Sequence, residues 1–254
     1  IAAAPQARSL AAELARGRVA QRFAAARVIA DRPAQIADND RSRPDGPVMR
    51  AHLELLGSAR SSVLVATPYF VPGAGGLAAL REARGRGVRL MVMTNSLATT
   101  DEPLVHFGYA RYRAALLQLG VALHELMPMP EGPAAADDGG ERHGASLARL
   151  HAKLVVVDAR WVSIGSMNMD RRSARCNTEA AIVIDDPVLA AEVADFLELG
   201  RASGSYALRL RGDGKHVEWI DRDGRAILRQ EPRPLAGPGL KPRLAALLVS
   251  EEML

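Results

Sequence analysis

The sequence of 254 residues has one cysteine, few aromatic residues and no long apolar run. The single cysteine, Cys176, excludes an internal disulfide. No stretch reaches the about 18 uncharged apolar residues of a transmembrane helix, and the N-terminus lacks the charged-then-apolar pattern of a signal peptide. The chain begins at Ile1 and not at Met, so we expect a fragment or a processed piece, with any membrane anchor upstream.

Net charge is also small, at +4, with an isoelectric point near 9.6. This mild basic excess suits an anionic substrate or an anionic membrane surface. It is too small to indicate nucleic acid binding by itself. Apolar residues make up 48% of the sequence, which is enough for the core of one large domain or of one domain with appendages.

Short apolar runs alternate with helical patterns through the middle of the chain. The runs SSVLVAT, VRLMVMTNS and VALHEL predict strands, and VMRAHLELLGSAR, GLAALREARGRG and PLVHFGYARYRAALLQLG predict helices. This alternation predicts an α/β layered fold with a largely parallel sheet. Ligands of such folds bind at the carboxyl ends of strands. That position makes Tyr69, Phe70, Asn95 and Ser96 candidates for the rim of a pocket, although turn chemistry explains Asn95 and Ser96 equally well.

The flanking segments differ in character. Residues 1–30 are rich in Ala and Arg and predict one or two helices, which pack on an upstream half or lie on a membrane. Residues 37–47 predict a linker, and residues 127–146 predict a loop without periodicity. A helix is predicted after Asp186, followed by a β-meander with Gly-Asp-Gly and Arg-Asp-Gly turns and by a short C-terminal amphipathic helix.

The stretch from residue 151 to residue 179 carries the reactive side chains. They are His151, Lys153, Asp158, Ser166, Asn168 and Glu179. The apolar run LVVV after Lys153 predicts a buried strand, and WVSIGS predicts a second strand that pairs with it as a hairpin through Asp158. Because residues two apart share one face of a strand, we expect His151 and Lys153 to project into one pocket.

These residue types suit attack on a phosphodiester. A neutral imidazole such as that of His151 can act as nucleophile, base or acid near neutrality. The Lys153 ammonium would bind a non-bridging phosphate oxygen, with Ser166 and Asn168 as further donors. The Glu179 carboxylate would orient an imidazole. Asp158 is a candidate catalytic carboxylate, and fixing the turn is an equally good explanation of it.

The spacing of these residues resembles the phospholipase D superfamily, whose members carry two copies of the motif in one active site. Segments such as TPYFVPG, TNSLATTDEP and RRSARCNTEAAIVIDD are similar to the C-terminal half of bacterial cardiolipin synthase-like proteins, of the C type. The resemblance implies a phospholipase D-like α-β-α layered sandwich, one of two half-domains, at residues 47–200. A helical arm and linker (1–46) would precede it, and a β-meander with a helical tail (201–254) would follow.

The resemblance also implies phosphatidyl transfer from a phosphatidylglycerol-like lipid. One histidine would form a phosphohistidine, and the histidine of the other half would protonate the leaving alcohol. It implies His151 as general acid/base, with the nucleophile assignment left open; Lys153, Ser166 and Asn168 bind phosphate, and Glu179 bonds a histidine. No cofactor or metal is expected, because two lysines neutralise the charge. A bacterial protein at the periphery of the inner (cytoplasmic) membrane is implied.

A second His-x-Lys pair is missing from this chain. The other five histidines lack a lysine two residues on: His52, His106, His124, His143 and His216. We therefore expect the chain alone to be nearly inactive, and its partner to be a missing N-terminal half or a second copy. Three functions stay open: half of a membrane-associated phosphatidyltransferase, a homodimeric phosphodiesterase or nuclease, or a binding or decayed domain. The arm, the meander and the lipid-synthase-like segments favour the first and disfavour nucleic acid as a partner.

Overall fold

The computed structural model describes residues 16–17, 22–33, 45–128, 150–221, 224 and 227–232. The strands are β1 (Ala25–Ala30), β2 (Ser62–Ala66), β3 (Arg89–Asn95), β4 (Ala122–Leu126), β5 (Leu154–Val157), β6 (Trp161–Gly165), β7 (Ala180–Asp185), β8 (Ser205–Leu210), β9 (Val217–Ile220) and β10 (Ile227–Leu228). The helices are α3 (Pro47–Ser58), α4 (Gly73–Gly85), α5 (Pro103–Ala110), α6 (Arg113–Gln118), α7 (Arg171–Arg175) and α8 (Pro187–Gly204).

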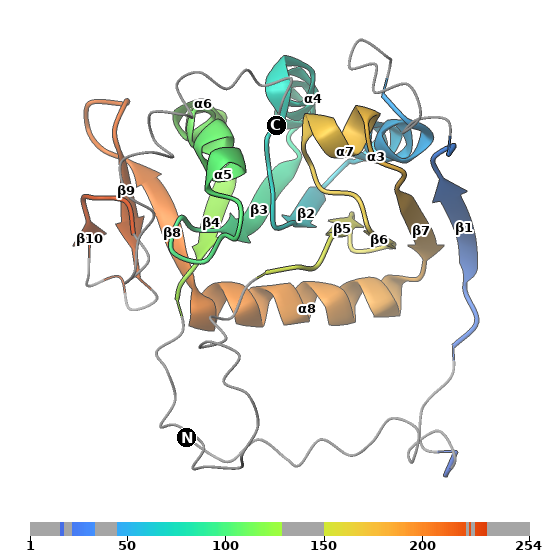
Figure 1. The fold of residues 1–254 in the computed structure, drawn as a ribbon. Helices are drawn as coiled ribbons and strands as arrows, with labels where there is room; N and C mark the ends of the chain where they lie inside the picture. Colours follow the sequence, from blue (N-terminus) through green and yellow to red (C-terminus); the bar gives the residue numbers. More distant parts are fainter. Residues whose placement is uncertain are drawn as a thin grey trace, which may run out of the picture.

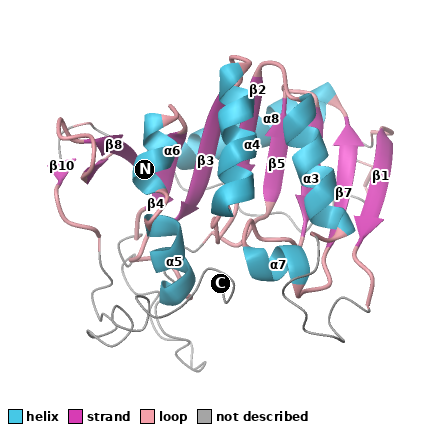
Figure 2. Ribbon diagram, turned by 90° about the horizontal axis from the view of Figure 1, so that it is seen from above, coloured by secondary structure: helices cyan, strands magenta, loops and turns pink. Residues whose placement is uncertain are grey.

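Within the described residues, ten strands form one sheet in the order β1-β7-β6-β5-β2-β3-β4-β8-β9-β10. The helix α8 lies along one face of this sheet, and α3, α4, α6 and α7 lie on the opposite side (Figure 1). Seen from that side, α3 and α4 lie over the sheet, roughly along its strands, with β5 visible between them (Figure 2). The layers are therefore α-β-α, as the sequence predicted.

The direction of the strands differs from the prediction. β2, β3 and β4 are parallel neighbours, and the other neighbouring pairs among the described strands are antiparallel. The prediction of a largely parallel sheet is therefore wrong. Short connections explain the pairs β5–β6, β8–β9 and β9–β10, because a hairpin can join only antiparallel strands. The pairs β1–β7, β2–β5 and β4–β8 join segments that are distant in the sequence. The β5–β6 hairpin turns with positive φ at Asp158 (54°) and Ala159 (50°), and the Arg160 N–H donates to the Val157 carbonyl at 3.0 Å. These features describe a type I′ turn.

The N-terminal part also contains a strand where the sequence predicted helix. Residues 25–30 form β1, which pairs antiparallel with β7 from Ala25 opposite Asp185 to Ala30 opposite Ala180. Helical propensity is a weak preference that tertiary pairing overrides. The predicted helices before residue 16, most of the linker, the loop after residue 128 and the C-terminal helix lie outside the described residues.

The helix α8 begins the C-terminal part of the described chain, and it starts where the sequence predicted a helix. The Asp186 carboxylate caps this helix by accepting from the N–H groups of Val188 and Leu189, at 2.8 and 3.2 Å. The strands β8, β9 and β10 form the predicted antiparallel meander. They extend the main sheet instead of forming a separate one, because β8 pairs with β4.

A buried ionic cluster around Arg113 joins the meander to the core. Arg113 donates from Nε to Glu125 Oε1 and from Nη1 to Glu231 Oε1, each at 2.7 Å. Trp219 in β9 donates from Nε1 to Glu125 Oε2 at 2.7 Å, and His106 Nε2 lies 2.8 Å from Glu231 Oε1. Removing one member of such a cluster leaves an uncompensated buried charge. The cluster therefore ties β9 and the segment after β10 to α5, α6 and β4.

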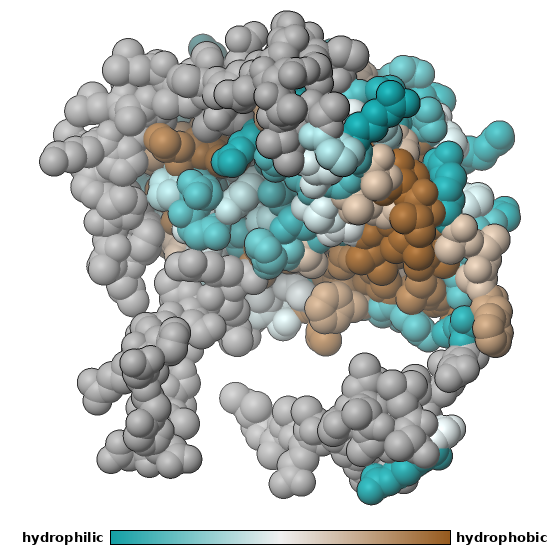
Figure 3. All heavy atoms as spheres, turned by 45° about the vertical axis from the view of Figure 1, so that its right-hand side comes forward, coloured by the Kyte–Doolittle hydropathy of each residue, from teal (hydrophilic) through white to brown (hydrophobic). Residues whose placement is uncertain are grey.

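An exposed apolar surface lies beside α8 on the side of β1, where Figure 3 shows a brown area. We call it the α8-side apolar surface, and its members are Phe23, Val28, Ile164, Val188, Phe196 and Leu199, from 37% to 97% exposed. Val28 stands opposite Ile182, which stands opposite Ile164, so all three share one face. Larger apolar surfaces of this kind mark interaction sites more often than scattered residues do.

Candidate active site

Most of the predicted site residues lie at one edge of the sheet. The pairing of Ala66 with Leu154 brings the carboxyl end of β2 to the amino end of β5. The pairing of Gly165 with Ala181 likewise brings the end of β6 to the start of β7. The parallel strand β3 ends at the same edge. The segments that carry His151, Lys153, Ser166, Asn168 and Glu179 therefore converge from separate strands.

His151 and Lys153 lie just before β5 and not within it. His151 is exposed, and Lys153 is half-buried, with its ammonium donating to the His151 carbonyl at 2.9 Å. Burial lowers the pKa of Lys153, and the nearby carboxylates of Glu179, Asp101 and Asp170 oppose that change. A cation that faces carboxylates and makes a single hydrogen bond within the described residues retains N–H groups for an anionic ligand.

Asn95 holds the segment that leads to His151. Its Nδ2 donates to the Leu150 carbonyl and its Oδ1 accepts from the Leu150 N–H, both at 3.0 Å. The side chain is 1% exposed. Asn95 was predicted as a rim residue. In the structure it positions the strand entry instead, because a paired amide of this kind has little capacity left for a ligand.

Ser166 and Glu179 form the closest contact at this edge. The Ser166 hydroxyl donates to Glu179 Oε2 at 2.5 Å, and Asn177 Nδ2 donates to Glu179 Oε1 at 3.0 Å. The Ala180 N–H donates to Ser166 Oγ at 3.1 Å. Glu179 is 6% exposed, so its charge lies in a low-dielectric position near Lys153. In this structure the hydrogen bonds of its carboxylate orient Ser166 and Asn177.

Gly165 shows why the motif places glycine before Ser166. A Cβ on Gly165 would lie 2.4 Å from the Ala180 carbonyl oxygen and 2.9 Å from the Ala181 Cα. Both are backbone atoms of the neighbouring strand and cannot move aside cheaply. Only glycine permits this close approach of β6 and β7, and the approach sets the distance between Ser166 and Glu179.

Asn168 lies where two segments meet. Its neighbour Met169 forms a short parallel bridge with Phe70, in which the Met169 N–H donates to the Tyr69 carbonyl at 3.1 Å. The Asn168 Oδ1 atom is buried and has no hydrogen-bond partner within the described residues. Buried polar atoms are normally paired. An unpaired acceptor in the segment that follows Ser166 therefore marks a position for a donor group of a ligand.

The two aromatic residues predicted at the rim take different positions. Tyr69 is half-buried and its hydroxyl donates to Asp101 Oδ1 at 2.9 Å. Burial and the Asp101 carboxylate raise the pKa of Tyr69. Phe70 is 5% exposed and packs edge-on against Tyr109, with ring centroids 6.4 Å apart. Its side chain thus belongs to the core and not to the rim of the phosphate site.

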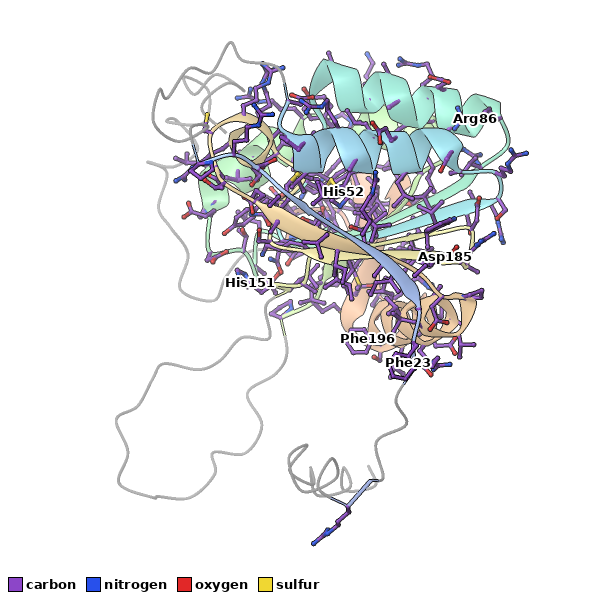
Figure 4. The ribbon with its side chains drawn as sticks, turned by 90° about the vertical axis from the view of Figure 1, so that its right-hand side faces the viewer. Phe23, His52, Arg86, His151, Asp185 and Phe196 are labelled. Atoms are coloured by element: carbon purple, nitrogen blue, oxygen red, sulfur yellow. The ribbon has the colours of Figure 1, made fainter. Side chains whose placement is uncertain are left out.

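Asp158 lies apart from the other predicted catalytic residues. It follows β5, whereas Lys153 precedes that strand, and five residues of extended chain span roughly 16 Å. Its carboxylate accepts from the N–H groups of Arg60, Ser61 and Ser62 at 2.7 to 3.2 Å. Figure 4 shows His151 and Asp185 at opposite ends of the sheet, and Arg160 beside Asp158 pairs with Asp185. Asp158 therefore fixes the turn, and its predicted catalytic role is corrected.

Sequence reasoning missed three acidic residues at this edge. Asp31, 6% exposed, accepts from the Glu179 N–H at 3.2 Å and from the Val48 N–H at 3.0 Å. Asp170 caps α7, and burial raises its pKa to about 6. The Asp101 carboxylate favours the charged form of Lys153 and accepts a hydrogen bond from the Tyr69 hydroxyl. An N-cap pattern before RRSAR could have indicated Asp170, but no sequence signal brings Asp31 to Glu179. Among the described residues, no three His, Cys, Asp or Glu side chains could hold a metal ion.

Residues 52–199 match the family model described as cardiolipin synthase, PLD-like domain. The chain belongs to the phospholipase D-like cardiolipin synthase family. It is 35% identical over 228 residues to cardiolipin synthase C of Escherichia coli K12, a match that covers 87% of this chain and 48% of that protein. It is 32% identical over 149 residues to cardiolipin synthase B of the same strain, covering 59% of this chain and 30% of that protein.

The chain thus spans about half the length, or less, of these curated relatives. Solved structures agree on the fold. Phosphatidylserine synthase of Haemophilus influenzae matches with a TM-score of 0.53 and 15% identity, covering 82% of this chain and 45% of that one. Nuc, a phospholipase D family member from Salmonella typhimurium, matches with a TM-score of 0.50 and 18% identity, covering 73% of this chain and all of that one. The predicted superfamily and α/β layered fold are confirmed.

Proposed function

We propose that this chain is one half of a phosphatidyltransferase of the cardiolipin synthase type. The observation that carries the proposal is the convergence at one sheet edge of Lys153, the Ser166–Glu179 pair and Asn168, beside the exposed His151. Such a set neutralises and positions a phosphate, and leaves an imidazole free to react.

The proposed reaction has two displacements at phosphorus. In the first, a histidine nitrogen bonds to phosphorus, the bond to the leaving alcohol breaks, and the second histidine gives that oxygen its proton. In the second, the acceptor hydroxyl loses its proton to that same histidine, its oxygen bonds to phosphorus, and the phosphorus–nitrogen bond breaks. We assign His151 as the acid and base. If His151 is instead the nucleophile, the same two displacements occur with the roles of the two histidines exchanged. Lys153 and Asn168 hold the non-bridging oxygens.

The proposed reaction needs a second His-x-Lys motif, which must come from another half or another copy. The α8-side apolar surface supports a partner beside the site. One of its members, Ile164 on β6, lies two residues before Ser166 of the site. The segment that carries Phe23 reaches α8, because Arg22 pairs with Glu192 at 2.8 Å. Burying exposed apolar side chains of this size is the main favourable term in association.

We further propose that the complete protein works at the periphery of the bacterial inner membrane on a phosphatidylglycerol-like lipid. No helix within the described residues is long and apolar enough to cross a bilayer. The mild net charge of +4 supports attraction to anionic lipid.

The test is cardiolipin formation from phosphatidylglycerol vesicles. The chain is assayed alone and then mixed with a separately produced polypeptide that carries a second His-x-Lys motif. We expect activity in the mixture, and a loss of about 10²–10⁴-fold in His151→Ala. The matched control is His216→Ala, since His216 is exposed and pairs with Asp213 in the meander. Radiolabelled phosphorus from the phosphatidyl group that stays on the protein at alkaline pH would report the phosphohistidine.

Other outcomes would contradict this proposal in different ways. Transfer or cleavage of a chromogenic phosphodiester by the chain alone, with a dimeric mass, would favour the homodimeric phosphodiesterase. An active mixture in which His151→Ala keeps its full rate would mean that this site is decayed and retains only the fold.

A further inference from the structure

A groove separates α3 from α4 on the face of the sheet opposite α8. It encloses a cavity of about 340 Å³. The strands β2 and β5 form its floor through Val63, Val65 and Val155, and α7 closes one end. Figure 2 shows the strand β5 between the two helices. The volume lies within the range of roughly 300–1,000 Å³ that small-molecule sites have.

The groove stays open because one wall is built from very small side chains. α4 presents Gly75, Gly76 and Ala79 to it, whereas α3 presents Met49 and Leu53. A Cβ on Gly75 would meet no atom within 4 Å. Gly75 is exposed, so this open space is continuous with solvent. The two helices therefore do not fill the gap between them, and an apolar ligand can enter it.

The polar groups of the groove gather at the α7 end. Arg171 and Arg175 line it there, and Arg175 pairs with Asp45 at 3.0 Å. The Nε atom of Arg171 is buried and has no hydrogen-bond partner within the described residues. An apolar channel with an unpaired guanidinium N–H at one end matches a ligand with a long apolar chain and an anionic head.

The two faces of the sheet also differ in charge. The helices α3 and α4 together contain three arginines and two glutamates. Residues 187–204, which form α8, contain three carboxylates and one arginine. Arg86, directly after α4, donates to the Leu56 carbonyl at the end of α3 at 3.2 Å and to Glu82 at 3.0 Å. The α3–α4 face is therefore the one that an anionic lipid surface attracts.

The groove adjoins the candidate active site. Met169 and Asp170 line it, and they directly follow Asn168. Asp170 also acts electrostatically on Lys153. A lipid whose phosphate lies at Lys153 and Asn168 would thus have its apolar part next to the α7 end of the groove. Phe70, predicted as a rim residue, contributes to the groove and not to the phosphate site.

We propose that the α3–α4 groove binds one acyl chain of the substrate phospholipid. The acyl chain enters at the α7 end, where Arg171 contacts the head whose phosphate lies at Lys153 and Asn168. This rests on the proposed function for the identity of the lipid as substrate. Binding itself needs neither the second His-x-Lys motif nor the reacting histidine.

The test measures binding of lysophosphatidylglycerols, below their micelle concentrations, to the 254-residue chain by calorimetry. Because each methylene withdrawn from water strengthens binding about fourfold, we expect affinity to rise about fifteenfold for each two carbons added, until the groove is full. Ala79→Phe should lower the affinity about tenfold or more and flatten this dependence. The matched control is Ala78→Phe, the same change at an exposed position on the same helix, and it should leave both unchanged.

Three results would overturn the proposal. The first is an Ala79→Phe protein, folded by circular dichroism, that keeps the chain-length dependence. The second is equal loss in Ala78→Phe. The third is binding that appears only after removal of residues 233–254, which would make that segment the natural occupant.

A His151→Ala protein separates this proposal from the proposed function. It should bind the lysolipids like the unmodified chain while its transfer activity is lost. Normal lipid binding without transfer in any mixture would mean that the groove is a lipid site and the proposed function is wrong. Transfer that persists in Ala79→Phe with unchanged lipid affinity would mean that the proposed function holds and that the groove is not the lipid site.

Discussion

Glu231 offers a direct test of the buried ionic cluster, and its stabilisation can be estimated from the structure. Its carboxylate accepts from Arg113 at 2.7 Å and lies 2.8 Å from His106 Nε2. These partners lower the pKa of Glu231 from its ordinary 4.5 to about 2. At 1.36 kcal/mol per unit, the difference corresponds to about 3 kcal/mol of folding free energy. Because the folded-state pKa is the lower one, this stabilisation is present above about pH 5 and is lost as the pH falls towards 2.

The variant Glu231→Gln removes this charge and keeps the shape of the side chain. We expect it to lower the free energy of unfolding by about 3 kcal/mol at pH 7, measured by urea denaturation. The difference from the unmodified chain should shrink as the pH falls, since the Glu231 carboxyl is then protonated and as neutral as the glutamine amide. The control is Glu192→Gln, because Glu192 is 61% exposed in its pair with Arg22 and such pairs contribute about 0–1 kcal/mol. A Glu231→Gln effect of equal size at pH 7 and below pH 3 would refute the electrostatic reasoning.

Three further predictions concern the site and its supports. Gly165→Ala should destabilise the chain by about 1–3 kcal/mol, measured by urea denaturation, because its Cβ would clash with the Ala180 carbonyl; normal stability would mean that β6 and β7 separate freely. Asp158→Ala should lower the free energy of unfolding by about 2 kcal/mol, because the carboxylate loses its backbone hydrogen bonds. The kcat of the mixture, measured well below the melting temperature, should be unchanged. A hundredfold fall in kcat would mean that Asp158 is catalytic. Asp31→Ala should lower kcat more than it changes KM, because Asp31 holds the Glu179 backbone, and Asp31→Asn should restore part of the loss; equal losses in both variants would point to a purely structural role.

Several elements could be predicted because their signal is local. The apolar runs LVVV and WVSIGS placed β5, β6 and their hairpin, since β-branched residues suit a pleated, half-buried surface. The cap at Asp186 placed the start of α8 for the same reason. The spacing of His151, Lys153 and Asn168 indicated the family, which the comparison with known proteins confirms.

Other features depend on contacts between distant parts of the chain. The strand β1 exists because β7 offers it a hydrogen-bonding edge, although its Ala-rich sequence favours helix. Asp31 reaches Glu179 across 148 positions, and Trp219 reaches Glu125 across 94. Asp158 and Lys153 belong to one short motif, yet β5 carries them to opposite edges of the sheet.

The sequence by itself therefore determined the family, the layered fold class and the identity of the residues that can handle a phosphate. Those properties follow from side-chain chemistry and from patterns that repeat within a few residues. The tertiary structure decided which of those side chains meet, which strands run parallel, and where apolar space is left open between α3 and α4. Pairing and packing are set by burial and hydrogen bonding over the whole chain, and a local pattern does not contain that information.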